Sequence, residues 1–344
     1  MPKLVAHRYG KARVRVLKVL RDGAVHRVKE IEVAALLDGD FASSYTSGDN
    51  SKVVPTDTIK NTINVLAKQH LGEELERFAV LLGDHFLKRY PQVHHAKIDI
   101  FERDWRRMEI DQKPHPHSFI SGGESRMFTN AICGRNSHSI KSGIHDLLML
   151  KSTGSGFENY PRDEFTTLPE TAERVLATSF SATWMFEKLP ANCREANSKI
   201  VSAMLKIFAE NYSPSAQTTL FQMGEAALAA CAEISHVDLA MPNKHYLLID
   251  LSPFGMENKN EVFVPTEEPH GQNITALVHR LEITIVQSGA DILHVAAQET
   301  AGELKRRREA RSAHREYRTA LSFIAAEARY QFVRVEGRKA ATGP

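Results

Sequence analysis

The first third of the chain changes between extended and helical hydrophobic patterns. Apolar residues recur at nearly alternate positions in residues 14–20 and 28–36, and Arg21-Asp22-Gly23 separates the two runs. Two such runs around an Asp-Gly turn are typical of a β-hairpin. From residue 58 the apolar period becomes that of one helical face, which carries Ile59, Ile63, Leu66 and His70. Leu71-Gly72 is expected to end this helix.

A second helix is predicted over residues 73–90, where Pro91 closes the helical pattern. Extended patterns then return, and the strongest strand candidates are residues 94–106 and 118–133. The first third is therefore predicted to fold as a hairpin, two helices and a second hairpin.

The same order of elements recurs in the next part of the chain, although no residue-level repeat is visible. Strands are predicted at 137–150 and 179–186, helices at 194–211 and 215–231, and strands at 237–251 and 261–264. A long connection rich in Gly, Ser, Pro and acidic residues covers 152–173. We expect an α+β fold of two tandem ββααββ units, residues 1–135 and 136–296, each an antiparallel sheet with helices on one face. Open sheet edges favour closure into a larger barrel by oligomerisation.

The last part of the chain, residues 297–344, has a different character. Charged residues dominate 303–318, and an apolar residue recurs at helical spacing at Tyr317, Leu321, Ile324, Ala328 and Phe332. We predict an amphipathic helical extension that packs one face on the body of the protein. Three glutamates interrupt the basic run, at Glu303, Glu309 and Glu316, which argues against an arm that binds nucleic acid.

Composition narrows the class of protein. The 344 residues are 42% hydrophobic, which is enough for a large core, and 44 Lys and Arg balance 42 Asp and Glu. Neither nucleic acid nor an anionic membrane is thus expected as a partner. The cysteines, Cys133, Cys193 and Cys231, are odd in number and far apart, as is typical of free buried thiols in a reducing compartment. The sequence shows neither a signal peptide nor an apolar run long enough to span a membrane, so a cytoplasmic protein is expected.

Four polar stretches are candidates for chemistry: Tyr9-Gly10-Lys11, VVPTDTIKNT at 53–62, GFENYPRDEFTTLPETAER at 156–174, and PNKHY at 242–246. In the second stretch Thr56 and Asp57 stand where a helix begins. Their simplest role is to cap that helix. The first amides of a helix and its positive dipole end also suit an anionic ligand, so capping and binding are both open at this position.

Six stretches together resemble the urate oxidase family: YGKARVRVLKV, VVPTDTIKNT, RDEFTTLPETAER, SPSAQTTL, MPNKHYLLIDLS and NEVFVPTEEPHG. They follow one another in the family's order from about residue 7 to about residue 271. The resemblance implies the tunnelling fold, a tandem of two ββααββ units, in a homotetramer that encloses a tunnel. It also implies oxidation of urate by O2 and water to 5-hydroxyisourate and hydrogen peroxide, with no cofactor.

The resemblance also implies which residues bind urate, a flat purine that is anionic at neutral pH. Arg174 would be the planar cationic fork, and Phe157 would stack on the ring. Gln217 would supply an amide that both donates and accepts, beside the backbone of Ala216, and the backbone of Asp57 would contact the purine. From the residues alone, Arg174 in PETAER reads as an exposed helix arginine and Gln217 as an ordinary helix residue.

A proton relay of Lys11, Thr56 and His245 is the catalytic group that the resemblance implies. Lys11 would take a proton from urate through the Thr56 hydroxyl, and His245 would exchange protons with Thr56 or water. Asn243, on the same strand face as His245, would hold O2 or water above the ring. If Lys11, Arg13 and Arg15 share one strand face, charge repulsion helps Lys11 to act as a base. The family places its sites at subunit interfaces, with Lys11 and Thr56 from one chain and Phe157, Arg174 and Gln217 from its neighbour.

Two other functions compete with this interpretation. The first is a zinc enzyme of the same fold that acts on purines or pterins, for which His115 and His117 could form a metal pair without a visible third ligand. The second is a non-catalytic binding protein that acts through the basic extension.

The chain ends in AATGP and not in a peroxisomal Ser-Lys-Leu signal, and residues after about 280 do not resemble the family.

Overall fold

The computed structural model describes residues 3–266, 275–280 and 332–336, and the chain divides into two units. The larger unit is Arg8–His279, and the smaller one combines Met1–His7 with Arg280–Pro344. In the smaller unit, β12 is a strand at Phe332–Glu336. The helix predicted over 297–344 is therefore wrong over residues 332–336, and the rest of it lies outside the described residues.

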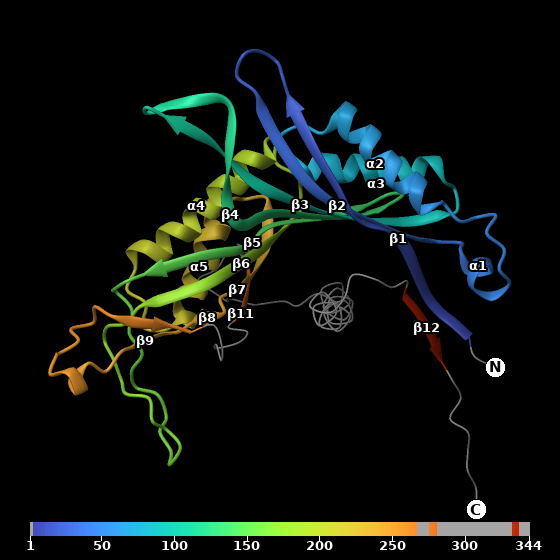
Figure 1. Cartoon of the computed structure of the whole chain (residues 1–344). Coiled ribbons are helices and arrows are strands. Elements are labelled where there is room, and N and C mark those ends of the chain that lie inside the picture. The colour runs from blue at the N-terminus through green and yellow to red at the C-terminus, as the bar shows by residue number, and fades with distance from the viewer. Residues whose placement is uncertain (1–2, 267–274, 281–331, 337–344) are drawn as a thin grey trace, which may run out of the picture. The chain divides into compact units, whose positions relative to one another are not determined.

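A single antiparallel sheet forms the body of the larger unit (Figure 1). Its main strands are β1 (Lys3–Leu20, of which residues 8–20 belong to this unit), β2 (Arg27–Gly39), β3 (Val93–Ile110), β4 (Lys113–Gly134), β5 (His138–Lys151), β6 (Leu176–Phe186), β7 (Ile234–Ala240) and β11 (Thr275–His279). Their order across the sheet is β11-β7-β6-β5-β4-β3-β2-β1. Every neighbouring pair is antiparallel, including β4 with β5, so the two predicted ββααββ units share one continuous sheet.

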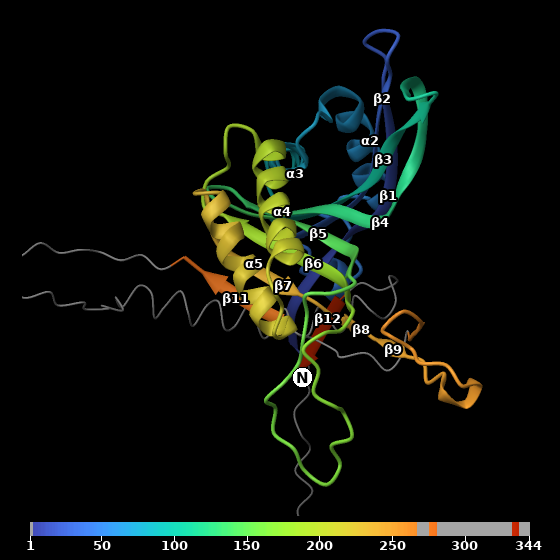
Figure 2. The same cartoon turned by 90° about the vertical axis from the view of Figure 1, so that its left-hand side faces the viewer.

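Four helices cover one face of this sheet (Figures 1 and 2). They are α2 (Thr56–His70), α3 (Leu75–Arg89), α4 (Cys193–Glu210) and α5 (Ala216–Ala230). The covered face is apolar: Val33, Ala35 and Leu37 of β2 are fully buried, whereas residues between them are only half-buried. The predicted α+β architecture with helices on one face is confirmed. A short helix, α1 (Ala42–Thr46), and a turn of 3₁₀ helix, Ser252–Phe254, were not predicted.

The end of the second ββααββ unit differs from the prediction. The strand expected over 237–251 stops at Ala240, and Pro242 explains the break because proline has no amide hydrogen for the ladder. The chain continues as β8 (Asn243–Lys244), which pairs with β6, and β9 (Tyr246–Leu248), which pairs with β10 (Phe263–Pro265) in a separate sheet. β11, which was not predicted, takes the place beside β7.

A buried polar cluster joins the two halves of the sheet beneath the helices. The carboxyl group of Glu76 on α3 accepts hydrogen bonds from the Ser142 hydroxyl on β5, from Asn197 Nδ2 on α4 at 2.7 Å, and from the Thr129 hydroxyl on β4 at 3.4 Å. Trp184 Nε1 on β6 in turn donates to Asn197 Oδ1 at 3.0 Å. Glu76 is 1% exposed, so one buried side chain links elements from both halves.

Candidate functional site

The start of α2 presents free backbone amides. Thr56 is the first helical residue, and the preceding Pro55 provides no side-chain cap. The first helical hydrogen bond runs from the Ile59 amide to the Pro55 carbonyl at 3.1 Å. Within the described residues, the amides of 56–58 and the half-buried Thr56 hydroxyl have no hydrogen-bond partner. This helix end therefore has donors and a positive dipole available for an anion.

The side chain of Asp57 is occupied by its own helix. One carboxylate oxygen contacts Lys60 Nζ, and the other accepts from Asn61 Nδ2 at 2.9 Å. The hydrogen bond from Lys60 is the main cause that lowers the pKa of Asp57, and the charge of Lys11 adds to the effect. Lys11 therefore lies within electrostatic reach of the helix start, and Asp57 has only its backbone amide left for a ligand.

Lys11 stands next to a β-bulge in β1. Lys11 pairs with Ala35 and Val14 pairs with Val33, so Ala12 and Arg13 together face one residue of β2, and Arg13 has a φ of 56°. Lys11 consequently shares the helix-covered face with its partner Ala35.

The extra residue puts Arg15 on the opposite face from Lys11. Arg15 pairs with Glu32, and its Nη2 bonds Glu30 Oε1 at 2.8 Å. The predicted common face of Lys11, Arg13 and Arg15 is wrong, because the inserted residue reverses the alternation between them.

A second group of candidate residues lies in the connection between β5 and β6. The backbones of Phe157 and Thr171 exchange two hydrogen bonds, of 2.7 and 3.1 Å. The Arg174 amide donates to the Ser155 carbonyl at 2.8 Å, and the guanidinium of Arg174 lies 5.4 Å from the centre of the Phe157 ring. Burial lowers the pKa of Arg174. The segment is irregular and not helical, so Arg174 is a half-buried side chain placed beside an aromatic ring.

The start of α5 is tied to this connection. The Gly156 amide donates to the Ser213 carbonyl at 2.8 Å, and Ser155 and Ser213 form a parallel β-bridge. Three residues later α5 begins at Ala216, which is buried, and its second residue Gln217 is exposed. A side chain at Gly156 would clash with the Tyr212 hydroxyl and the Thr171 carbonyl, so the close approach requires glycine here. The structure thus brings Phe157, Arg174, Ala216 and Gln217 into one region.

Asn243 and His245 lie beside the start of β6. Asn243 pairs with Thr178, and Asn243 Nδ2 lies 3.4 Å from His245 Nδ1, so the two side chains point the same way. His245 itself falls between β8 and β9, where its carbonyl accepts from the Thr266 amide at 2.9 Å. The buried hydroxyl of Thr178 has no hydrogen-bond partner among the described residues. An amide and an imidazole are therefore held together beside the strand that follows Arg174.

The candidate residues fall into two groups within one chain. Lys11 and the start of α2 belong to the β1 end of the sheet, whereas Arg174 and Asn243 flank β6. β1 and β6 are five strand steps apart, and at about 4.8 Å per step this is roughly 24 Å along the sheet. No hydrogen bond or ion pair joins the two groups in the part of the chain that the structure describes. One small planar ligand cannot reach both groups of the same chain.

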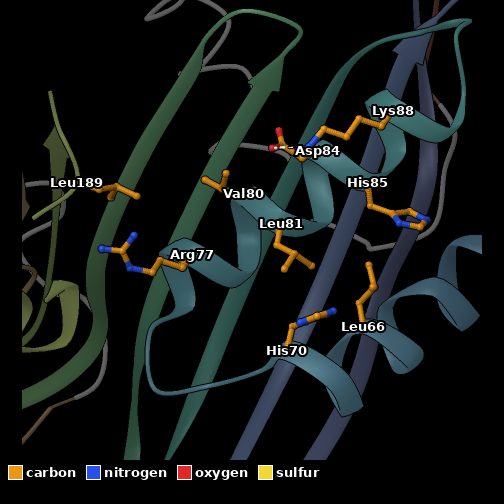
Figure 3. A pocket seen from close by; sticks show the side chains of 9 residues that line it. All are labelled: Leu66, His70, Arg77, Val80, Leu81, Asp84, His85, Lys88 and Leu189. Atoms are coloured by element: carbon orange, nitrogen blue, oxygen red, sulfur yellow. Dashed lines mark ion pairs between the residues drawn. The ribbon is translucent and has the colours of Figure 1, made fainter. Parts of the chain in front are cut away.

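A groove of about 530 Å³ lies outside both groups, between α2 and α3 (Figure 3). Leucine and valine side chains form much of its surface, and its charged side chains are paired. Arg77 Nε bonds Glu74 at 2.7 Å, and Asp84 lies 3.6 Å from Lys88 Nζ and 2.8 Å from His138 Nε2. None of the candidate residues lines this groove.

The structure does not gather metal ligands or form a membrane span in the residues it describes. No group of three or more His, Cys, Asp or Glu side chains there is arranged to hold a metal ion, so His115 and His117 lack a third ligand in this conformation. None of the described helices is long and apolar enough to cross a membrane.

Tyr9 and Ser155 contribute to these groups but were not predicted to do so. Tyr9 belongs to one of the four polar stretches, and its hydroxyl accepts a hydrogen bond from the Val54 amide at 2.6 Å, just before α2, which depends on tertiary structure. Ser155 had no distinguishing signal in a connection rich in serine and glycine.

Comparisons with known proteins point to one family. The sequence profile of the uricase family matches residues 7–132 and 140–274. The uricase of Aspergillus flavus is 42% identical over 289 residues, covering 79% of this chain and 95% of that protein. The uricase of Dictyostelium discoideum is 39% identical over 274 residues, covering 79% of this chain and 96% of that protein. The crystal structure of the uricase from Arthrobacter globiformis superimposes with a TM-score of 0.76 at 36% identity, covering 85% and 98% of the two chains.

Proposed function

Since the chain belongs to the uricase family, we propose that it is a urate oxidase whose site forms between two copies of the chain. The observation that carries this proposal is the separation of the two residue groups across five strands. One copy would supply Lys11, Thr56 and Asp57, and its neighbour would supply the residues around Arg174 and Asn243. A homotetramer that encloses a tunnel is the assembly we expect, because it closes the sheet and completes the sites together.

Each group offers what an anionic purine requires. The guanidinium of Arg174 presents a planar fork for an oxygen and a nitrogen of urate, and Phe157 beside it provides an aromatic face. Tyr160 stacks on Phe157 with ring centres 4.8 Å apart, which fixes the ring before urate arrives. Gln217 at the start of α5 donates and accepts in the plane of the purine, beside the backbone of Ala216. The free amide of Asp57 on the other copy completes the contacts at the edge of the ring.

The chemistry begins with removal of a proton from urate. Lys11 accepts this proton through the Thr56 hydroxyl, and the resulting dianion is electron-rich enough to transfer electrons to O2 one at a time. Two electrons leave the purine, O2 takes them with two protons to become hydrogen peroxide, and water adds to the oxidised ring to give 5-hydroxyisourate. Urate, O2 and H2O balance 5-hydroxyisourate and H2O2, and urate is itself the reductant. The reaction as written requires no cofactor.

Asn243 and His245 would handle O2, water and the second proton. The amide of Asn243 can hold a small polar molecule above the ring, and the imidazole of His245, 3.4 Å from that amide, can donate or accept a proton. The comparisons support neither a zinc enzyme nor a binding protein that acts through the extension. We expect a cytoplasmic enzyme that uses urate and O2 without a nucleic-acid or membrane partner.

The activity is tested with metal-stripped protein in air. Loss of the near-UV absorbance of urate, with formation of an equal amount of peroxide, is the expected result. Lys11→Met and Thr56→Ala should each lose most of the rate, about 10²-fold, and should still bind a purine analogue. Absence of turnover in the unaltered protein would refute the function, and unchanged rates in both variants would refute the relay.

The shared site is tested by mixing two inactive variants. Thr56→Ala and Arg174→Ala damage different groups, so a site between copies can combine an intact group from each variant. Co-expressed in equal amounts, the pair should recover about a quarter of the unaltered activity, because each half of a site is intact in one copy of two. A pair that stays as inactive as either variant alone would show that each site belongs to a single chain.

A further inference from the structure

The two halves of the chain contain the same β-bulge at equivalent places. In the first half, Lys11 and Val14 of β1 pair with Ala35 and Val33, two residues apart on β2. In the second half, Ile144 and Leu147 of β5 pair with residues 182 and 180, which are also two apart, on β6. Each bulge has a left-handed residue, with φ of 56° at Arg13 in one and 59° at Asp146 in the other.

A glycine precedes each bulge for the same steric reason. A side chain at Gly10 would clash with the Ala35 carbonyl, and one at Gly143 would clash with the Ala182 carbonyl. The sequences GKARV and GIHDL thus occupy equivalent backbone, and their residues can be compared one by one. The bulge and its glycine are therefore features of the repeated scaffold and not of one site.

The side chains at equivalent positions differ. Ile144 stands where the first half has Lys11, so the second half has no amine at this place. Ser142 stands where the first half has Tyr9, and its hydroxyl bonds the buried Glu76. The lysine and the tyrosine are what distinguish the first bulge from the second.

Tyr9 makes a contact that has no counterpart in the second half. Its hydroxyl accepts a hydrogen bond from the Val54 amide at 2.6 Å, two residues before Thr56. Tyr9 is 6% exposed and Val54 is 1% exposed, so no water can replace this bond without moving the chain. The Tyr9 ring is fixed by an edge-to-face contact with Phe41, with centres 4.8 Å apart.

From this geometry we propose that Tyr9 is a positioning residue for the relay, since it ties the strand that carries Lys11 to the approach of the helix that carries Thr56. The inference rests on the proposed function, because it assigns Lys11 and Thr56 to one reaction. Pro55, immediately after Val54, fixes φ at the next position and transmits the placement of Val54 to Thr56. Burial raises the pKa of Tyr9 to about 12, so the phenol stays neutral over the working range of the enzyme.

Tyr9→Phe is the decisive variant, because it removes only the hydroxyl and keeps the ring on Phe41. A displacement of about 1 Å between catalytic groups can reduce a rate by roughly 10²-fold, so we expect kcat to fall about 10- to 100-fold. The pH at which kcat reaches half of its maximum should also move, since the proton path changes. Binding of a purine analogue, which depends mainly on Arg174 and Gln217, should change little.

Ser142→Ala is the matched control. It also deletes a buried hydroxyl bond at the equivalent position, but far from the relay, so it should lower stability and leave kcat and the pH profile unchanged. If Tyr9→Phe and Ser142→Ala have the same kcat and pH profile, Tyr9 has only a structural role and the proposal is overturned. If the unaltered protein does not oxidise urate, the proposed function fails instead.

Hydrogen exchange of the unaltered protein gives a test that does not depend on the folding of a variant. In a peptide that covers residues 52–58 the buried amide of Val54 should be strongly protected, in addition to the amide of Val53, which donates to the Asn50 carbonyl at 3.0 Å. Exchange of the Val54 amide, resolved from that of Val53, at the rate of an open loop would show that the Tyr9 bond does not hold in solution, and would overturn the proposal.

Discussion

The buried carboxyl group of Glu76 gives the sharpest prediction about stability. Glu76→Met preserves the approximate volume and the helix but removes the acceptor for Ser142, Asn197 and Thr129. All four side chains are buried, so these donors cannot turn to water. Each buried donor without a partner costs about 1–3 kcal/mol, and Thr129 contributes least because its hydroxyl also lies 3.1 Å from that of Ser142. We therefore expect a loss of about 3–5 kcal/mol.

Glu76→Gln is the control for this prediction. The amide oxygen of glutamine can still accept from the hydroxyl and amide donors, so the loss should be about 1 kcal/mol. Urea unfolding followed by far-UV circular dichroism at fixed protein concentration measures both variants. At a slope of about 2–3 kcal/mol per molar urea, the midpoint should fall by roughly 1–2 M for Glu76→Met. A midpoint within about 0.3 M of the unaltered protein would show that the cluster is not what joins the halves.

Two further predictions concern the sheet. Gly10→Ala should destabilise the protein by at least about 2 kcal/mol in the same urea assay, because the added carbon clashes with the Ala35 carbonyl. Gly72→Ala is the control, because its added carbon meets open space and should leave stability unchanged. Equal effects of the two variants would contradict the steric argument. Burial lowers the pKa of His236 to about 4, despite the opposing charge of Asp238 and with small effects of Lys141 and His279. As the pH falls, the unfolded chain binds this proton before the folded protein does, so the contribution of His236 to stability is fully present above about pH 6.5. Stability should fall by roughly 1–2 kcal/mol towards pH 4, which is less than the two pKa values alone imply because the side chain is partly exposed. His236→Asn should remove that part of the decline, and an unchanged pH profile of the urea midpoint would refute the assignment.

The order of elements could be predicted because periodicity and turn residues agree in most of the chain. The four long helices begin and end within two residues of their expected positions, since Pro91 and apolar residues at helical spacing mark them clearly. The predictions failed where tertiary context decides the outcome. The run after Ala240 has strand-like composition, but Pro242 interrupts its ladder, and β11 becomes a strand because β7 offers an edge.

The candidate residues could be named from short motifs, but their geometry could not. Nothing in GKARV shows that one residue is inserted between Lys11 and Val14, and a regular strand would place Arg15 beside Lys11. PETAER has good helix formers, but the bonds from Phe157 to Thr171 and from Arg174 to Ser155 hold it in an irregular path. These bonds join residues 14 and 19 positions apart, beyond the reach of local patterns.

The continuity of the sheet also bears on how the chain is made. The first half leaves the ribosome with β4 as an exposed edge, and residues 126–133 of that edge are covered only when β5 has been synthesised. Of the donors to Glu76, Ser142 arrives with β5 itself and Asn197 arrives later still. Until then the nascent chain exposes the open edge of β4, and the Glu76 carboxyl group has only the Thr129 hydroxyl as a donor. Chaperones protect this kind of intermediate from aggregation. The time that the ribosome takes to translate residues 134–197 therefore sets how long this intermediate is exposed.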